Sequence, residues 1–86
     1  MEQTRAEIVT QRVADFKQSF ESGPGMRTLA HLSEFCFEKG MTFVENSDIS
    51  AFREGKRAVI LEIRRWLEFD LTKLRKENDN EQDRIS

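Results

Sequence analysis

Hydrophobic residues in the first twenty positions recur at the spacing of one helix face. Val9, Val13, Phe16 and Phe20 are separated by four, three and four residues, which is the period of an amphipathic helix. The preceding segment Thr4–Glu7 has the pattern of a capping box, in which the threonine hydroxyl and the glutamate carboxylate bond to backbone donors of the first turn. The pattern predicts a first helix that begins at this box and ends within the segment ESGPGM, residues 21–26.

A turn rich in glycine and proline follows. The segment GPG at residues 23–25 interrupts the first helix, because proline lacks a backbone donor and glycine favours turns. Proline is tolerated in a first helical turn, so a second helix is predicted from Pro24 or Gly25 to Lys39, with Gly40 as its stop. Its apolar side is expected to contain Leu29, Leu32 and Cys36, flanked by Met26, Phe35 and Phe37.

A third helix is predicted from Ser47 or Asp48, whose side chains cap helices well, to Lys76. In the connection before it, Met41, Phe43 and Val44 are expected to fold onto the core. A helix with a broad apolar stripe usually packs on more than one partner, so the third helix is expected to be central. The stripe consists of Phe52, Val59, Ile60, Ile63, Trp66, Leu67 and Leu74.

The expected fold class is therefore all-α: one small three-helix domain, residues 1–86, with a long C-terminal helix as the central element. The ordered core is predicted to span about residues 4–76, and the polar residues 77–86 are predicted to form a frayed tail. A single core in a chain of 86 residues leaves only a few kcal/mol of net stability. Self-association therefore stays an open alternative to a monomer.

Gly55 lies at the margin of the apolar stripe of the third helix. A glycine inside a helix costs about 1 kcal/mol relative to alanine, so a packing reason is expected. The prediction is a close helix crossing, in which a side chain of an earlier helix lies against the bare backbone; a kink and an unpacked site are the alternatives. Leu29, Leu32, Val59 and Ile63 are expected to supply the surrounding packing.

Three arginines follow one line of the third helix. Arg53, Arg57 and Arg64 are spaced by four and seven residues, so their side chains project in nearly one direction. Two interpretations stay open: a solvated face with local ion pairs, or a ridge that docks onto phosphates or an acidic protein surface. Trp66 either fills the core or anchors an interface. These four residues form the candidate partner-binding set.

Composition and motifs narrow the chemistry. The net charge of -2 gives no overall attraction to nucleic acid or anionic membranes, and no apolar run is long enough to span a bilayer. His31 and Cys36 are the only histidine and cysteine, and their spacing of five points them in different directions on a helix. No catalytic residue, cofactor site or metal site is therefore predicted.

The stretches FESGPGMRTLAHLSEFC and FREGKRAVILEIRRWL resemble a family of small tailed-bacteriophage proteins encoded near head and portal genes. The family pattern is a phenylalanine ahead of a glycine, then Arg-x-Leu-x-x-Leu, then Arg-Glu-Gly-x-Arg leading into an aliphatic helix. The resemblance implies a phage origin and a non-enzymatic part in virion assembly or infection, and it transfers no catalytic residues. The matching positions are Phe20, Gly25, Arg27, Leu29, Leu32, Arg53, Glu54, Gly55, Arg57, Val59 and Ile63.

Three functions are compatible with this sequence. The first is a structural or virion-assembly module that binds a phage protein or a second copy of itself, and the second is a regulator that binds a host protein. The third is nucleic-acid binding through the arginine line, against which the acidic balance and the lack of tyrosine argue. The lone Cys36 and the absence of a secretory signal predict the cytoplasm of the infected host, and the first function adds the virion.

Overall fold

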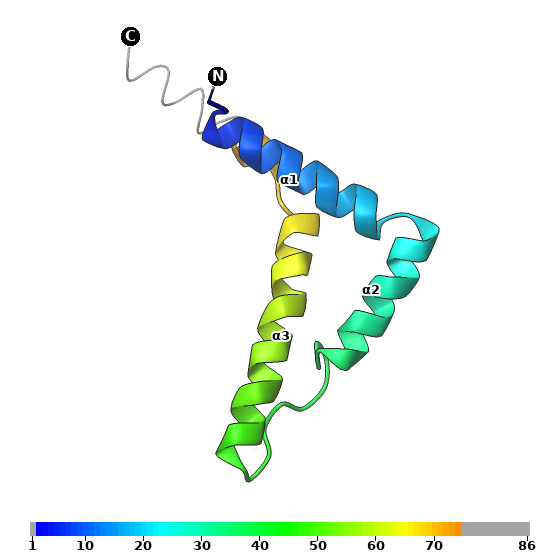
Figure 1. Cartoon of the computed structure of the whole chain (residues 1–86), viewed down its shortest axis with the longest axis vertical. Helices are drawn as coiled ribbons and strands as arrows, with labels where there is room; N and C mark the ends of the chain where they lie inside the picture. Colours follow the sequence, from blue (N-terminus) through cyan, green and yellow to red (C-terminus); the bar gives the residue numbers. More distant parts are fainter. Residues whose placement is uncertain (1, 75–86) are drawn as a thin grey trace.

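The computed structural model describes residues 2–74, and its regular elements are helices (Figure 1). Helix α1 spans Arg5–Phe20, α2 spans Gly23–Phe35 and α3 spans Ser47–Leu67, and one further helical turn covers residues 71–74. No strand occurs among the described residues. The all-α, three-helix fold predicted from the sequence is therefore confirmed.

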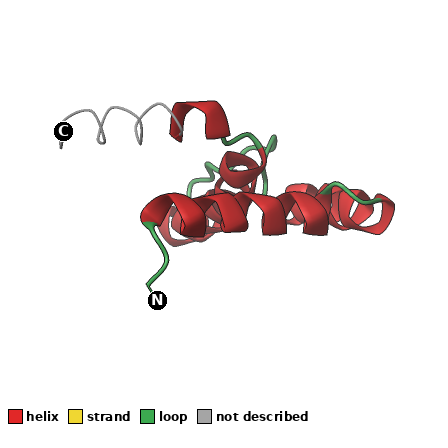
Figure 2. Cartoon of the chain, turned by 90° about the horizontal axis from the view of Figure 1, so that it is seen from above, coloured by secondary structure: helices red, strands yellow, loops and turns green. Residues whose placement is uncertain are grey.

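The three helices form an open triangle in roughly one layer (Figures 1 and 2). Helix α1 leads through a tight corner into α2, and α3 contacts both of them. Because helices in a single layer have neighbours at their edges rather than all around them, few side chains are fully covered. The buried apolar residues are Val13, Leu29, Cys36, Ile60 and Leu74.

A core cluster joins α2 to the C-terminal half of α3. Ile60 is 0% exposed and packs with Leu29 and Cys36. Val59 is 57% exposed, so its predicted packing role is wrong: each helical residue turns by about 100 degrees, and Ile60 rather than Val59 meets the core. Half-buried residues complete the cluster: Phe20, Leu32, Ile63 and Leu67.

The glycine that permits a close helix contact is Gly25 rather than Gly55. A Cβ atom built at Gly25 would overlap the carbonyl oxygen of Ser19 and lie 2.9 Å from the Cα atom of Phe20. At Gly55 the same atom meets nothing within 4 Å, so the predicted helix crossing there is wrong. The N–H group of Gly25 donates a hydrogen bond to the hydroxyl of Ser22 at 3.2 Å, which caps α2 at the same corner.

Helix α2 ends four residues earlier than predicted. Phe37 has a left-handed backbone with a φ of 56°, and its N–H donates to the carbonyl oxygen of Glu34 at 3.2 Å. The N–H of Glu38 donates to the carbonyl oxygen of Ser33 at 3.0 Å. These two bonds form a Schellman motif, whose left-handed position is usually a glycine. Gly40 was therefore the wrong stop signal.

Helix α3 is also shorter than predicted. The N–H of Glu68 donates to the carbonyl oxygen of Arg64 at 2.9 Å and closes the helix. Asp70 then accepts a hydrogen bond from the N–H of Thr72 at 2.9 Å, and such side-chain bonds compete with helix continuation. The predicted continuous helix is therefore wrong, and the predicted tail, residues 77–86, lies outside the described residues.

The connection between α2 and α3 leaves its largest apolar side chains on the surface. Met41 is 78% and Phe43 is 74% exposed, so the prediction that they fold onto the core is wrong. Val44 is half-buried, and its N–H donates to the Ser50 hydroxyl, which in turn donates to the Val44 carbonyl oxygen. Asn46, rather than the predicted serine or aspartate, caps α3. Polar bonds therefore fix this connection.

Candidate functional site

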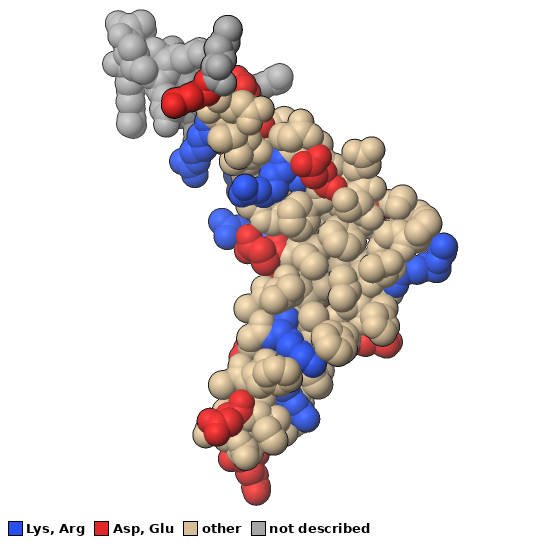
Figure 3. Space-filling view, viewed as in Figure 1, with Lys and Arg blue, Asp and Glu red and all other residues tan. Residues whose placement is uncertain are grey.

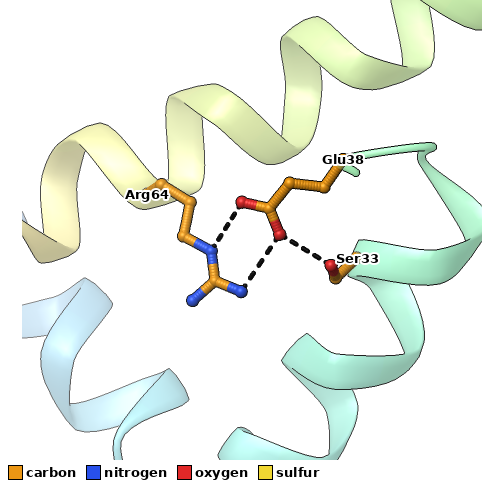
Figure 4. A network of polar contacts seen from close by, with 3 residues as sticks. All are labelled: Ser33, Glu38 and Arg64. Atoms are coloured by element: carbon orange, nitrogen blue, oxygen red, sulfur yellow. Dashed lines mark hydrogen bonds and ion pairs between the residues drawn. The ribbon is translucent and has the colours of Figure 1, made fainter. Parts of the chain in front are cut away.

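Arg64 does not lie on an outer ridge. Its Nε donates to Glu38 Oε2 at 2.9 Å, and its Nη2 donates to Glu38 Oε1 at 3.1 Å (Figure 4). The hydroxyl of Ser33 donates to the same carboxylate at 2.6 Å. The Glu38 side chain is only 12% exposed. The prediction of Arg64 as a solvent-facing docking residue is therefore wrong, because its guanidinium joins α3 to the end of α2.

This cluster has a clear electrostatic signature. The hydrogen bond from Arg64, followed by that from Ser33, holds the pKa of Glu38 below its ordinary value despite the opposing effect of burial. The hydrogen bond to Glu38 in turn raises the pKa of Arg64. Both shifts favour the charged forms, as a paired carboxylate and guanidinium require. The pair is a structural connection between α3 and the segment that follows α2.

Trp66 is half-buried where α1 meets the end of α3. Its ring centroid lies 6.1 Å from that of Phe16 and 5.7 Å from that of Phe69. The guanidinium carbon of Arg12 is 5.1 Å from the ring centroid, and Nε1 donates to Glu62 at 2.8 Å. The tryptophan thus packs between elements of this chain, which corresponds to the core interpretation of the sequence.

The other two predicted arginines are also partly covered. Arg53 lies over the ring of Phe37, with its guanidinium carbon 4.9 Å from the centroid. The Nε of Arg57 is buried and has no hydrogen-bond partner among residues 2–74. Arg53 and Arg64 both face the segment that follows α2, so the three arginines do not form the exposed ridge that their spacing predicts.

A different group of exposed and half-buried side chains lies where the end of α2 is beside α3. The ammonium of Lys56 is 3.8 Å from the ring centroid of Phe35, 4.9 Å from that of Phe52 and 5.7 Å from that of Phe37. Arg53 lies over the Phe37 ring at the same place. These five residues form what we term the aromatic–cation surface. Cations over ring faces are attracted by the ring quadrupole.

Much of the apolar area of this surface is open to solvent. Phe52 is 64% exposed and Phe35 is 55% exposed. Ile49 (45%) and Val59 (57%) extend the patch along α3, because they stand three residues before and seven after Phe52 on the same side of the helix. In Figure 3, basic side chains on this half of α3 are surrounded by uncharged atoms. Contiguous exposed apolar patches mark interaction sites.

The two cations of the surface lack a carboxylate partner within residues 2–74. The ion pairs found there are Arg64 with Glu38 and Arg65 with Glu62, the latter at 3.7 Å. Lys56 and Arg53 are instead held by aromatic rings. The aromatic–cation surface therefore carries uncompensated positive charge next to exposed apolar groups.

The sequence patterns did not identify this surface. The pattern places Phe52 and Val59 in the core stripe and Arg53 on the arginine line, and it includes Lys56 in neither. Seven phenylalanines in a chain of 86 residues are more than a small core can cover, and this excess predicts that a partner buries some of the rings without indicating which ones.

The remaining chemistry of the described residues is sparse. His31 is exposed and stacks on Phe35 with 6.5 Å between ring centroids, and Cys36 is buried in the core. No three histidine, cysteine, aspartate or glutamate residues within residues 2–74 gather closely enough to hold a metal ion. In the same part of the chain, no helix combines the length and apolar character needed to cross a bilayer.

Comparison with protein families gives one informative match. Residues 16–80, which include α2, α3 and the whole aromatic–cation surface, match the family described as Bbp19-like phage protein. Comparisons with curated proteins and with solved structures gave no match. The matched region contains both stretches on which the resemblance to small phage proteins rested, and it covers well over half of the chain. The chain belongs to the family of Bbp19-like phage proteins.

Proposed function

We propose that this phage protein is a non-enzymatic interaction module that takes part in assembly or structure of the phage particle, and that its contact region is the aromatic–cation surface. The observation that carries the proposal is the exposure of Phe35, Phe52, Ile49 and Val59 on one side of the molecule. A small monomer rarely leaves so many large apolar side chains together in solvent unless a partner covers them.

The energetics favour protein as the partner. Full burial of one large apolar side chain contributes about 1.5–3 kcal/mol, and aromatic residues are enriched among the side chains that dominate protein interfaces. Phe52 and Phe35 are two such residues, and Lys56 already holds both rings in place. When a partner covers these two rings, their side chains would therefore lose little conformational entropy.

The test is site-specific photo-crosslinking in phage-infected cells. Phe52 is replaced by p-benzoylphenylalanine, and the matched control carries the same replacement at Ile8, which is 42% exposed on α1, away from this surface. We expect position 52 to crosslink to a phage-encoded protein that sediments with particles or assembly intermediates, and position 8 not to do so.

Two results would contradict the proposal. Crosslinking from position 52 to a host protein alone would replace the assembly role with regulation of that host protein. The absence of any crosslink from position 52, in a variant that folds and is present at the wild-type level, would rule out this surface as a contact region.

A further inference from the structure

We infer that the partner bound by the aromatic–cation surface is an acidic protein segment, in which a carboxylate stands between apolar side chains, and that Lys56 and Arg53 select it. This inference rests on the proposed function, because it names the chemistry of the partner at the same surface. It starts from the position of the Lys56 ammonium among the rings of Phe35, Phe37 and Phe52.

The ammonium is positioned but not neutralised. Ring faces attract a cation, yet an ammonium has three N–H donors, and no carboxylate within residues 2–74 forms an ion pair with Lys56 or Arg53. A partner that covers Phe52 and Phe35 must also cover these two cations. Burying a cation without a counter-charge costs free energy, whereas pairing it with a carboxylate offsets that cost.

Charge complementarity therefore distinguishes between basic, uncharged and acidic protein partners. A basic segment would bring like charges together, which costs several kcal/mol at an interface. An uncharged apolar segment would leave Lys56 and Arg53 buried and unpaired. An acidic segment with apolar neighbours satisfies both the cations and the exposed residues Ile49 and Val59, so it is the occupant that this surface fits.

Single-stranded nucleic acid fits the surface less well. Its bases would need open ring faces for stacking, but Lys56 lies over Phe35 and Phe52. The flanking residues Ile49 and Val59 are aliphatic and offer no stacking face. The surface contains only two cations, Lys56 and Arg53, and few phosphate contacts give little affinity at moderate salt.

The backbone at Phe37 supports the same inference. A residue other than glycine in the left-handed region costs about 1–2 kcal/mol, and Phe37 occupies it at a φ of 56°. Its ring lies under Arg53 and 5.7 Å from the Lys56 ammonium. Strain of this kind clusters at binding sites, where a side chain must hold its neighbours in position. Phe37 is therefore a positioning residue for the two cations.

The test selects short random peptides displayed on a surface against the wild-type full-length chain. We expect the enriched peptides to contain aspartate or glutamate next to aromatic or branched apolar residues. Lys56→Glu should weaken their binding about tenfold or more, and changing the peptide acid to lysine should restore binding to this variant. The matched control is Lys73→Glu, the same charge change at an exposed residue outside the surface, which should leave binding unchanged.

Every other outcome contradicts either the inference about the acidic partner or the proposed contact surface. The inference is overturned if the enriched peptides lack acidic residues or bind Lys56→Glu as tightly as the wild-type protein. If Phe52→Ser abolishes the binding of such peptides, the proposed contact surface is still supported. If Phe52→Ser does not change the binding of the enriched peptides, or if no peptide is enriched, the result contradicts the proposed contact surface itself. Oligonucleotide binding that Lys56→Glu abolishes, without acidic peptides among the selected sequences, replaces the protein partner with nucleic acid.

Discussion

Arg64 and Glu38 are 26 positions apart in the sequence and meet through two hydrogen bonds on different guanidinium nitrogens. The contact depends on the left-handed residue Phe37, which turns the chain so that Glu38 faces α3. It connects the segment after α2 to α3 at a point where the core is thin.

The first prediction concerns the ion pair. Glu38→Gln should lower the free energy of unfolding by about 1–2 kcal/mol, because a charge-assisted bidentate contact on a partly exposed arginine is lost. Urea denaturation measures the change. Glu34→Gln is the matched control on an exposed carboxylate, and its effect should stay within about 0.5 kcal/mol. Equal effects of the two substitutions would rule out a stabilising ion pair.

The second prediction concerns pH. Folding lowers the pKa of Glu38 from its ordinary value of 4.5, so folding favours the carboxylate. Its contribution is complete above the unfolded pKa and is lost as the pH falls through the lower folded pKa. Unfolding free energies measured over the acid range should therefore fall less steeply below about pH 4.5 in Glu38→Gln than in wild type. Identical slopes would show that Glu38 does not contribute.

The third prediction contrasts two glycines. Gly25→Ala should destabilise the fold by about 1–3 kcal/mol, because its Cβ would collide with the α1 backbone at Ser19. Gly55→Ala should instead stabilise it by about 0.5–1 kcal/mol, since the added methyl meets nothing and alanine favours helix. Thermal unfolding followed by circular dichroism measures both. If Gly55→Ala destabilised the fold, the result would support the helix crossing predicted from the sequence.

The fourth prediction isolates the strain at Phe37. Phe37→Gly and Phe37→Ala both remove the ring, but only alanine keeps a Cβ atom in the left-handed region. The glycine variant should therefore be more stable than the alanine variant by about 1 kcal/mol. Chemical denaturation gives the difference directly. If the alanine variant were the more stable of the two, the left-handed turn would not be present in solution.

The fifth prediction uses two adjacent residues of α3. Ile60→Ala should lower the free energy of unfolding by about 2–5 kcal/mol, because Ile60 is 0% exposed. Val59→Ala should change it by less than about 0.5 kcal/mol, because Val59 is mainly in solvent. Under the proposed function, Val59→Ala should instead reduce crosslinking from position 52. Similar losses of stability in the two variants would place both residues in the core.

The start of α1 and the proline in the first turn of α2 could be predicted because these signals are local, whereas the cap of α3 is Asn46 and not the predicted serine or aspartate. The Thr4 hydroxyl accepts a hydrogen bond from the N–H of Glu7 at 3.1 Å, which is the threonine half of the predicted capping box, and Pro24 lies in the first turn of α2. The end of α2 could not be predicted in this way. Its left-handed residue is Phe37 rather than a glycine, and the ring contacts that hold it there come from α3, far along the chain.

The extent of the core could not be predicted either. Helical spacing indicates that Phe52, Val59 and Ile63 share one face of α3, but it does not indicate how far the neighbouring helix reaches. Helix α2 is shorter than predicted, so the N-terminal part of that face stays uncovered while Ile63 packs in the core. For the same reason Arg64, which suits a local pair by spacing, finds Glu38 in the segment after α2 instead.

Helix α3 runs without a break from its Asn46 cap to Leu67, through both the exposed half and the half that holds Ile60. An uninterrupted α-helix behaves as a stiff rod over this length. Under the proposed function, a partner bound near Phe52 would therefore also fix the orientation of α1 and α2 relative to itself. In a repeating shell or tail, binding at this end would give every copy of the protein the same orientation.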